Sequence, residues 1–65
     1  MKICQYCNSK MCSEFETQKD KSYNFFYICL NCRSIYEGKK DKNNIVLKSR
    51  WWNNDKRKFE NIYNY

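Results

Sequence analysis

The 65-residue sequence contains no histidine and no proline, and it has only one glycine. Without histidine, the chain has no imidazole that could serve as a general base near neutral pH. It also has no apolar run long enough to cross a membrane or to form the core of a secretory signal peptide. Its few carboxylates form no evident acidic pair. We therefore expect a protein without catalytic activity, located in the cytoplasm, the nucleoid or the nucleus and not secreted.

Cysteine, by contrast, is abundant for so short a chain. A single domain over residues 1–65 buries only about 60% of its unfolded surface and needs an additional cross-link. Four of the five cysteines form two Cys-x-x-Cys pairs, Cys4 with Cys7 and Cys29 with Cys32. Each such turn directs two thiolates at one point, so two turns complete a tetrahedral sulfur site that suits Zn²⁺. The sequence therefore predicts one structural Zn²⁺ bound by these four cysteines.

Disulfide bonds are the alternative use of these cysteines. Thiols stay reduced in the cytoplasm, and five cysteines leave one thiol without a disulfide partner, so metal binding is favoured. The fifth cysteine, Cys12, is too close to Cys7 to join the same regular turn. We expect Cys12 to be a small, half-buried strand residue. The alternative is that it exchanges with a metal ligand or reacts with a partner.

Alternating and apolar segments predict a mainly-β fold. The second of these segments is apolar on both faces, as expected for the central strand of a small sheet. The third segment is followed by Gly38, which we expect to end it, and then by a polar turn at residues 39–44. The predicted strands are residues 10–17, 23–28, 33–37 and 45–48.

The end of the chain carries a helix-like pattern. Asn54 or Asp55 could cap a short helix. In that helix Phe59, Ile62 and Tyr63 would form an apolar stripe able to dock onto the sheet. The predicted fold is a small, metal-stabilised, mainly-β domain with a three- to four-stranded antiparallel sheet and a short C-terminal helix.

The order of turn, hairpin, turn and strand resembles a zinc ribbon over residues 1–38, with the four paired cysteines matching the ligand pattern. The resemblance implies a structural zinc and a role in binding nucleic acid or protein, as in transcription factors, polymerase subunits, and viral or phage proteins. Rubredoxins share this cysteine geometry with iron, but their turns carry glycine and proline. Here Asn8 and Arg33 follow the turns, so an iron electron carrier is not favoured. Asn8 tolerates the left-handed backbone that glycine provides in many such turns.

The net charge is +6 before metal binding. Four thiolates and one Zn²⁺ add −2, which leaves about +4. Residues 1–36 contain five basic and three acidic side chains, so the bound site cancels their surplus. Residues 37–65 contain eight basic and four acidic side chains and carry the remaining positive charge. Such a field favours anionic partners, and nucleic acid first, although it also keeps a small protein soluble.

A basic and aromatic extension, residues 39–65, is expected to pack on the ribbon and to carry the partner-binding surface. Its cations would contact phosphates while an exposed indole stacks on a base. Adjacent strand residues face opposite sides, so we expect at least one tryptophan in the core and the other available to a partner. The predicted nucleic-acid or partner-binding residues are Lys48, Arg50, Trp51, Trp52, Lys56, Arg57 and Lys58.

Two functions follow from these features. The first is a non-catalytic zinc-ribbon protein that binds nucleic acid or acts in transcription. The alternative is a protein-interaction module, such as a polymerase-associated subunit or a phage or viral protein that docks on a host enzyme and modulates it. Neither function requires a membrane or a small-molecule substrate.

Overall fold

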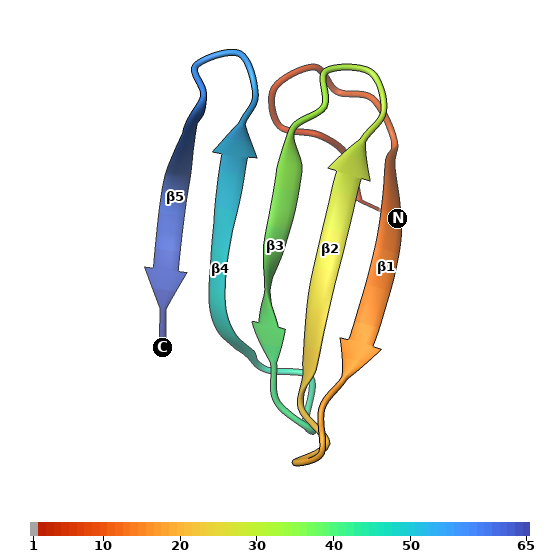
Figure 1. Ribbon diagram of the computed structural model, residues 1–65, viewed down its shortest axis with the longest axis vertical. Helices are drawn as coiled ribbons and strands as arrows, with labels where there is room; N and C mark the ends of the chain where they lie inside the picture. The colour runs from red at the N-terminus through yellow and green to blue at the C-terminus, as the bar shows by residue number, and fades with distance from the viewer. Residues whose placement is uncertain (1) are drawn as a thin grey trace.

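The five strands of the computed structural model form one open antiparallel sheet in which each strand pairs with its neighbour in sequence (Figure 1). The structure describes residues 2–65, so the first residue of the predicted domain lies outside the described residues. In this part of the chain, no helix is long and apolar enough to cross a membrane. The strands are β1 (Met11–Thr17), β2 (Tyr23–Cys29), β3 (Ile35–Lys40), β4 (Val46–Asn53) and β5 (Lys58–Asn64).

The predicted first hairpin is confirmed. β1 pairs with β2 in register from Met11 opposite Cys29 to Thr17 opposite Tyr23. β2 lies between β1 and β3, as its two apolar faces predicted. Its Phe25 is the largest fully buried side chain, with 1% of its surface exposed.

The prediction that Gly38 ends the third strand is wrong. β3 continues through Gly38 to Lys40, and Gly38 pairs with Phe25 on one side and Ser49 on the other. A Cβ at this position would clash with the Lys48 carbonyl oxygen and would lie 2.7 Å from Phe25 Cζ. The glycine therefore makes room for the ring of its neighbour and does not form a turn.

The predicted C-terminal helix is also wrong, because the segment forms β5 instead. The residue that caps the turn there is Asn53 and not the predicted Asn54 or Asp55, since Asn53 Oδ1 accepts hydrogen bonds from the amides of Asp55 and Lys56 at 3.1 Å. This turn does not continue into a helix and ends at Arg57, which has a left-handed φ of 59°. The chain then returns along β4, so the sheet has five strands and not three or four.

The two faces of the sheet differ in what covers them. Residues directly opposite in a ladder point to the same face. The aromatic face carries Phe25, Tyr27, Tyr36 and Trp51, and the N-terminal segment packs over one end of it through Tyr6. We call the opposite side the open face, because within residues 2–65 no second sheet or helix covers it.

The core lies on the aromatic face. Tyr36 stacks between Phe25, at 5.2 Å between ring centroids, and Trp51, at 4.9 Å. Trp51 is only 6% exposed, whereas its neighbour Trp52 lies half-buried on the open face. This confirms the prediction that at least one tryptophan belongs to the core and that adjacent tryptophans face opposite sides.

Candidate metal centre

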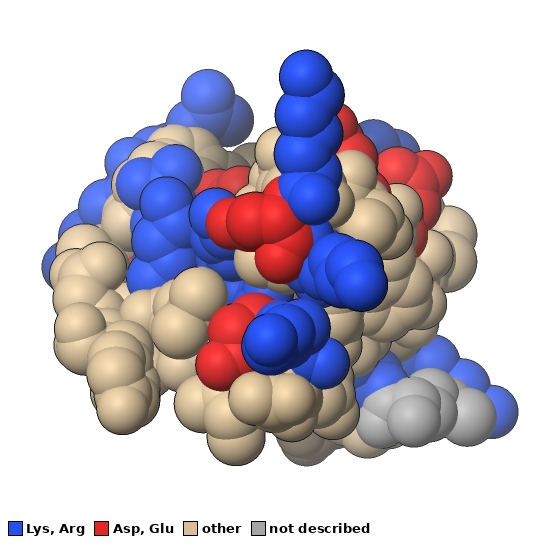
Figure 2. Space-filling model, turned by 90° about the horizontal axis from the view of Figure 1, so that it is seen from below, with Lys and Arg blue, Asp and Glu red and all other residues tan. Residues whose placement is uncertain are grey.

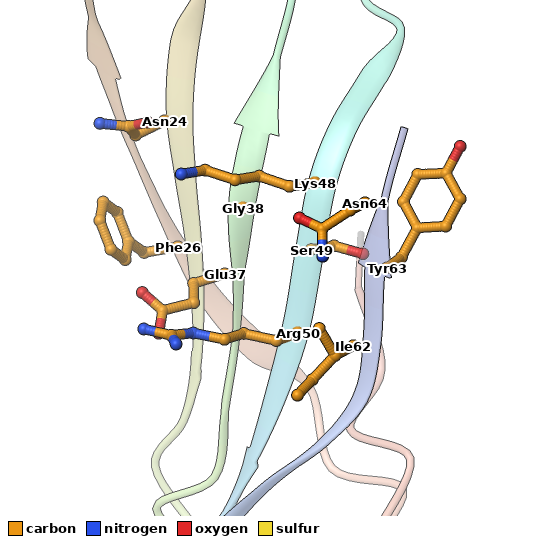
Figure 3. A pocket seen from close by; sticks show the side chains of 10 residues that line it. All are labelled: Asn24, Phe26, Glu37, Gly38, Lys48, Ser49, Arg50, Ile62, Tyr63 and Asn64. Carbon is orange, nitrogen blue, oxygen red and sulfur yellow. The ribbon is translucent and has the colours of Figure 1, made fainter.

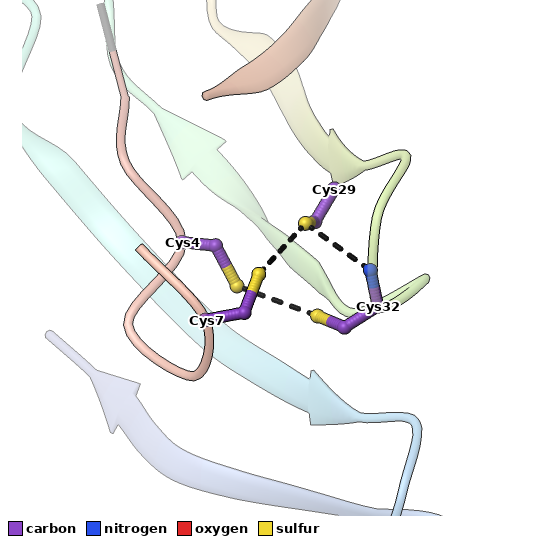
Figure 4. Close-up of side chains that lie close together, drawn as sticks. All are labelled: Cys4, Cys7, Cys29 and Cys32. Carbon is purple, nitrogen blue, oxygen red and sulfur yellow. Dashed lines mark hydrogen bonds between the residues drawn. The ribbon is translucent and has the colours of Figure 1, made fainter. Parts of the chain in front are cut away.

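Four cysteines meet where the N-terminal segment crosses the connection between β2 and β3 (Figure 4). Their sulfur atoms all lie within 4.8 Å of one another. Cys4 and Cys29 are fully buried, whereas Cys7 and Cys32 are half-buried. These four cysteines are the ones that the sequence predicts as ligands.

The two Cys-x-x-Cys turns have matching backbone hydrogen bonds. In the first, the Asn8 amide donates to the Cys4 carbonyl at 2.9 Å, and in the second the Arg33 amide donates to the Cys29 carbonyl at 2.8 Å. Asn8 and Arg33 both have left-handed φ angles, 62° and 67°. The left-handed backbone predicted for Asn8 is therefore confirmed, and Arg33 adopts it as well. A serine completes each turn by accepting a hydrogen bond from the first cysteine's amide at 2.9 Å.

The sulfur positions fit a tetrahedral metal ion. With metal–sulfur bonds of about 2.3 Å, the sulfur atoms of a tetrahedron lie about 3.8 Å apart. The Cys4–Cys32 and Cys7–Cys29 sulfur pairs are 3.6 Å and 3.4 Å apart. These distances are far longer than the ~2.05 Å of a disulfide bond. The four thiols could therefore hold one metal ion, and their chemistry suits a soft or borderline cation.

Backbone amides support the sulfur atoms from outside the site. The Tyr6 amide lies 3.4 Å from Cys4 Sγ, and the Cys32 amide lies 3.5 Å from Cys29 Sγ. Such donors orient thiolate ligands and partly balance their charge.

The thiols differ in how readily they ionise. Burial raises the pKa of Cys4 to about 12. Hydrogen bonds from the Asn31 and Ser9 side chains lower the pKa of Cys7 to about 5. Cysteines bind metal as thiolates, so metal binding at this site would release protons.

The first turn is tied to the far side of the sheet by Tyr6. Its hydroxyl donates a 2.8 Å hydrogen bond to Glu60 Oε1 on β5, and Asn53 Nδ2 donates to the same oxygen at 2.9 Å. The Tyr6 ring also packs edge-on against Trp51, at 5.6 Å between centroids. Tyr6 is thus a packing residue, and it connects the cysteine site to the C-terminal hairpin.

Cys12 stands apart from the other cysteines. It lies on β1 opposite Ile28, outside the four-cysteine cluster. The prediction that it is half-buried is wrong, because its side chain is exposed. β1 is an edge strand whose only buried residue is Met11, so nothing covers Cys12 on the open face.

The seven predicted partner-binding residues do not form one patch. Lys48, Arg50 and Trp52 share the open face of β4, whereas Trp51 is buried on the aromatic face. In the end view of Figure 2, basic side chains lie on several sides of the molecule with acidic side chains between them. The remaining three, Lys56, Arg57 and Lys58, lie exposed in or beside the turn between β4 and β5.

The sequence did not indicate the β2 and β5 residues that join Lys48 and Arg50. Asn24 and Phe26 on β2 and Asn64 on β5 line the same groove of the open face (Figure 3). Only strand register brings them together, since Lys48 lies opposite Lys39, which lies opposite Asn24.

Comparisons of the chain with protein-family models, with curated proteins and with solved structures found no match. The resemblance of residues 1–38 to a zinc ribbon is therefore not confirmed. The structure has a five-stranded open antiparallel sheet with a four-cysteine site that could hold a metal ion.

Proposed function

We propose that this chain is a small, non-catalytic protein in which a structural Zn²⁺ holds together a sheet that binds nucleic acid. The four-cysteine cluster carries the zinc part of the proposal. Four thiolates fill a tetrahedral shell, so no position stays open for a substrate or a reactive water. Zinc would supply folding energy at this site and no chemistry.

The nucleic-acid part is supported by the residues that share the open face of β4. Lys48 and Arg50 are both exposed and lie beside the half-buried Trp52. Cations next to an accessible indole are the usual elements of phosphate binding and base stacking. The turn that follows adds Arg57, whose guanidinium lies 6.0 Å from the Trp52 ring centroid.

A salt titration tests this proposal. The zinc-loaded chain is mixed with labelled mixed-sequence nucleic acids, and binding is followed by fluorescence anisotropy from low to high salt. We expect log K to fall linearly with log salt, by about 0.7–0.9 per phosphate contact. Replacing Lys48 and Arg50 with glutamine should flatten the slope. Absence of binding at low salt would reject the nucleic-acid role.

A protein-binding role is the second candidate, and one observation favours it. Apolar residues form a row across the open face through directly opposite partners on β2 to β5. An uncovered apolar row on a small domain is a common feature of protein interfaces. Under this alternative, charge substitutions would mainly slow association, and truncating Trp52 would speed dissociation. The row consists of Ile28, Ile35, Trp52 and Phe59.

A further inference from the structure

The open face contains a groove that combines aromatic, amide and basic side chains. Its volume is about 430 Å³, and residues of β2, β3, β4 and β5 line it. In Figure 3 the Lys48 and Arg50 side chains extend from β4 across β3 toward β2. We propose that this groove binds single-stranded nucleic acid, as a specific form of the nucleic-acid role proposed above, with bases against the sheet and phosphates on Lys48 of the groove and on Lys39, its cross-strand neighbour on the open face.

The shape of the molecule favours a single strand over a duplex. Reading a duplex requires an element that enters a groove of the DNA, such as a helix or a projecting two-stranded ribbon. No helix is present within residues 2–65, and Lys48 and Arg50 lie on a broad sheet surface. A flat sheet with aromatic side chains suits bases that are unstacked and splayed out.

The groove offers partners for the bases. The Phe26 ring is half-buried and offers a surface on which a base can stack. Asn24 and Asn64 present amides that can donate to and accept from base edges. Glu37 can accept a hydrogen bond from an exocyclic amine, although Arg50 Nε already lies 3.2 Å from its Oε1.

Two lysines are available to bind phosphates, because within the described residues no ion pair offsets their charge. Lys39 and Lys48 lie directly opposite each other on β3 and β4, and neither is in an ion pair, unlike Arg50. Arg57, beside Trp52, extends the positive charge toward the turn between β4 and β5.

Acidic side chains limit the path of the strand at the other edge. Glu14 and Glu16 lie exposed on β1, directly opposite Phe26 and Asn24, and so they share the open face. A phosphate backbone is repelled from this edge and attracted to β3 and β4. The single strand would therefore run along the β3 and β4 side of the open face, where Lys39 and Lys48 lie opposite each other.

Two neighbouring lysines provide a matched test. Lys39 lies on the open face with Asn24, whereas Lys40 lies on the aromatic face, with its Nζ 5.5 Å from the Phe25 ring centroid. Lys39→Gln and Lys40→Gln therefore remove the same charge from opposite faces of one strand. The zinc-loaded variants are compared for binding to a labelled ten-nucleotide single strand and to the same sequence as a duplex.

We expect the single strand to bind at least tenfold more tightly than the duplex. Lys39→Gln should weaken single-strand binding about threefold and lower the salt slope by about 0.7, whereas Lys40→Gln should change neither. Phe26→Leu keeps an apolar side chain but removes the ring, and should weaken binding at least fivefold. The double variant Glu14→Gln with Glu16→Gln should bind more tightly. Zinc content and circular dichroism verify that each variant is folded.

The outcomes separate this inference from the proposed function. Equal binding of duplex and single strand, or equal effects of the two lysine substitutions, would overturn the inference while nucleic-acid binding stands. Absence of binding to either nucleic acid would overturn both. If the chain instead dimerises through Phe26 and Trp52, with sedimentation velocity showing the dimer and Phe26→Leu dissolving it, the open face is a protein interface and the inference is wrong.

Discussion

At the scale of single residues, the positions after the two cysteine turns both have a left-handed backbone, but they differ in how well their residues suit it. Asparagine tolerates this conformation better than most residues because its short polar side chain can hydrogen-bond locally, whereas the arginine at position 33 has no such advantage. The left-handed backbone is needed at both positions, because each residue donates the amide hydrogen bond that closes its turn. The strain at Arg33 should therefore be removable without loss of the turn.

We predict that Arg33→Gly stabilises the zinc-loaded chain by up to about 1 kcal/mol, because glycine adopts a left-handed φ without a Cβ clash. Arg33→Val should destabilise it by roughly 1–2 kcal/mol, since a β-branched residue is unsuited to this conformation. Urea unfolding at a fixed excess of zinc measures both. Asn8→Gly is the control in the equivalent turn and should have a smaller effect. A destabilising Arg33→Gly would mean that the arginine side chain has a role of its own.

The five cysteines should respond differently to substitution. Cys29→Ser removes a fully buried sulfur from the cluster, so we expect it to abolish metal retention and folding. Cys12→Ser changes an exposed thiol outside the cluster and should keep both. Metal analysis of the purified variants measures the difference. A full complement of zinc in Cys29→Ser, or its loss in Cys12→Ser, would show that the ligand set is wrong.

At the scale of elements, Gly38 shows how a residue can be misread when its neighbours are unknown. A lone glycine before a run of lysines is typical of a strand end, and the sequence does not reveal that Phe25 lies beside it. Cross-strand register supplies the reason for the glycine, since the ring and the Lys48 carbonyl occupy the space of a Cβ. Non-local contacts of this kind are not encoded in a local pattern.

Gly38→Ala should therefore destabilise the chain by about 1–3 kcal/mol through overpacking against the sheet backbone and Phe25. Thermal unfolding of the zinc-loaded variant measures this. Ser13→Ala, on an exposed position of β1, is the control and should change stability little. A neutral Gly38→Ala would mean that β3 and β4 separate easily at this point.

The C-terminal segment was misread for a related reason. Phe59, Ile62 and Tyr63 recur at helical spacing. Phe59 and Tyr63 also fit a strand whose pairing register shifts between them. The ladder between β4 and β5 shifts register near Ser49, and Asn61 takes a left-handed φ of 52°. At this shift β5 has one more residue than β4, and the extra residue hides the alternation of the strand in the sequence.

The first half of the chain was predictable because local rules suffice there. Paired cysteines fix the turns, and the alternation in residues 10–17 together with the apolar, aromatic run of residues 23–28 fixes the hairpin between them. The open-face groove was not predictable, since Asn24, Lys48 and Asn64 are brought together by pairing across several strands. The cysteine site could thus be predicted from the spacing of the cysteines, whereas the groove follows only from the pairing register of the strands.

At the scale of the whole molecule, the cysteine site and the C-terminal hairpin are parts of one packing unit. Tyr6, within the first turn, contacts Trp51 and donates to Glu60. The core is a single layer of aromatic side chains, too small to fold without a cross-link. Loss of the metal should therefore disrupt the packing of β4 and β5 as well as the cysteine turns.

Chelation of the metal tests whether the cysteine site and the C-terminal hairpin are coupled. In a Trp52→Phe variant the only tryptophan is Trp51, which is 6% exposed in the folded chain. Removing the metal with a strong chelator should shift its fluorescence to longer wavelength and abolish the near-ultraviolet circular dichroism, because the covering turn unfolds. Restoring zinc should reverse both changes. An unchanged spectrum in metal-free protein would show that the sheet folds without the site.

The hydrogen bonds to Glu60 add a pH dependence to the same link. Donors from Asn53 and Tyr6 lower the pKa of Glu60 below its ordinary value of 4.5. A carboxyl with a lowered folded-state pKa stabilises the fold fully above the unfolded value, and this contribution is lost as pH falls through the folded value. Glu60→Gln should therefore destabilise the zinc-loaded chain near pH 6, and the difference from wild type should shrink below pH 4.5.

Acid also protonates thiolates and releases metal, so the measured quantity is the difference between variants at each pH and not stability itself. Tyr6→Phe supplies the second side of a double-mutant cycle, because it removes one of the two donors to Glu60 Oε1 and keeps the ring against Trp51. The effect of Glu60→Gln should be smaller in that background at pH 6. Additive effects would mean that Asn53 alone holds the carboxylate and that the first turn is coupled to β5 only through the Tyr6 ring.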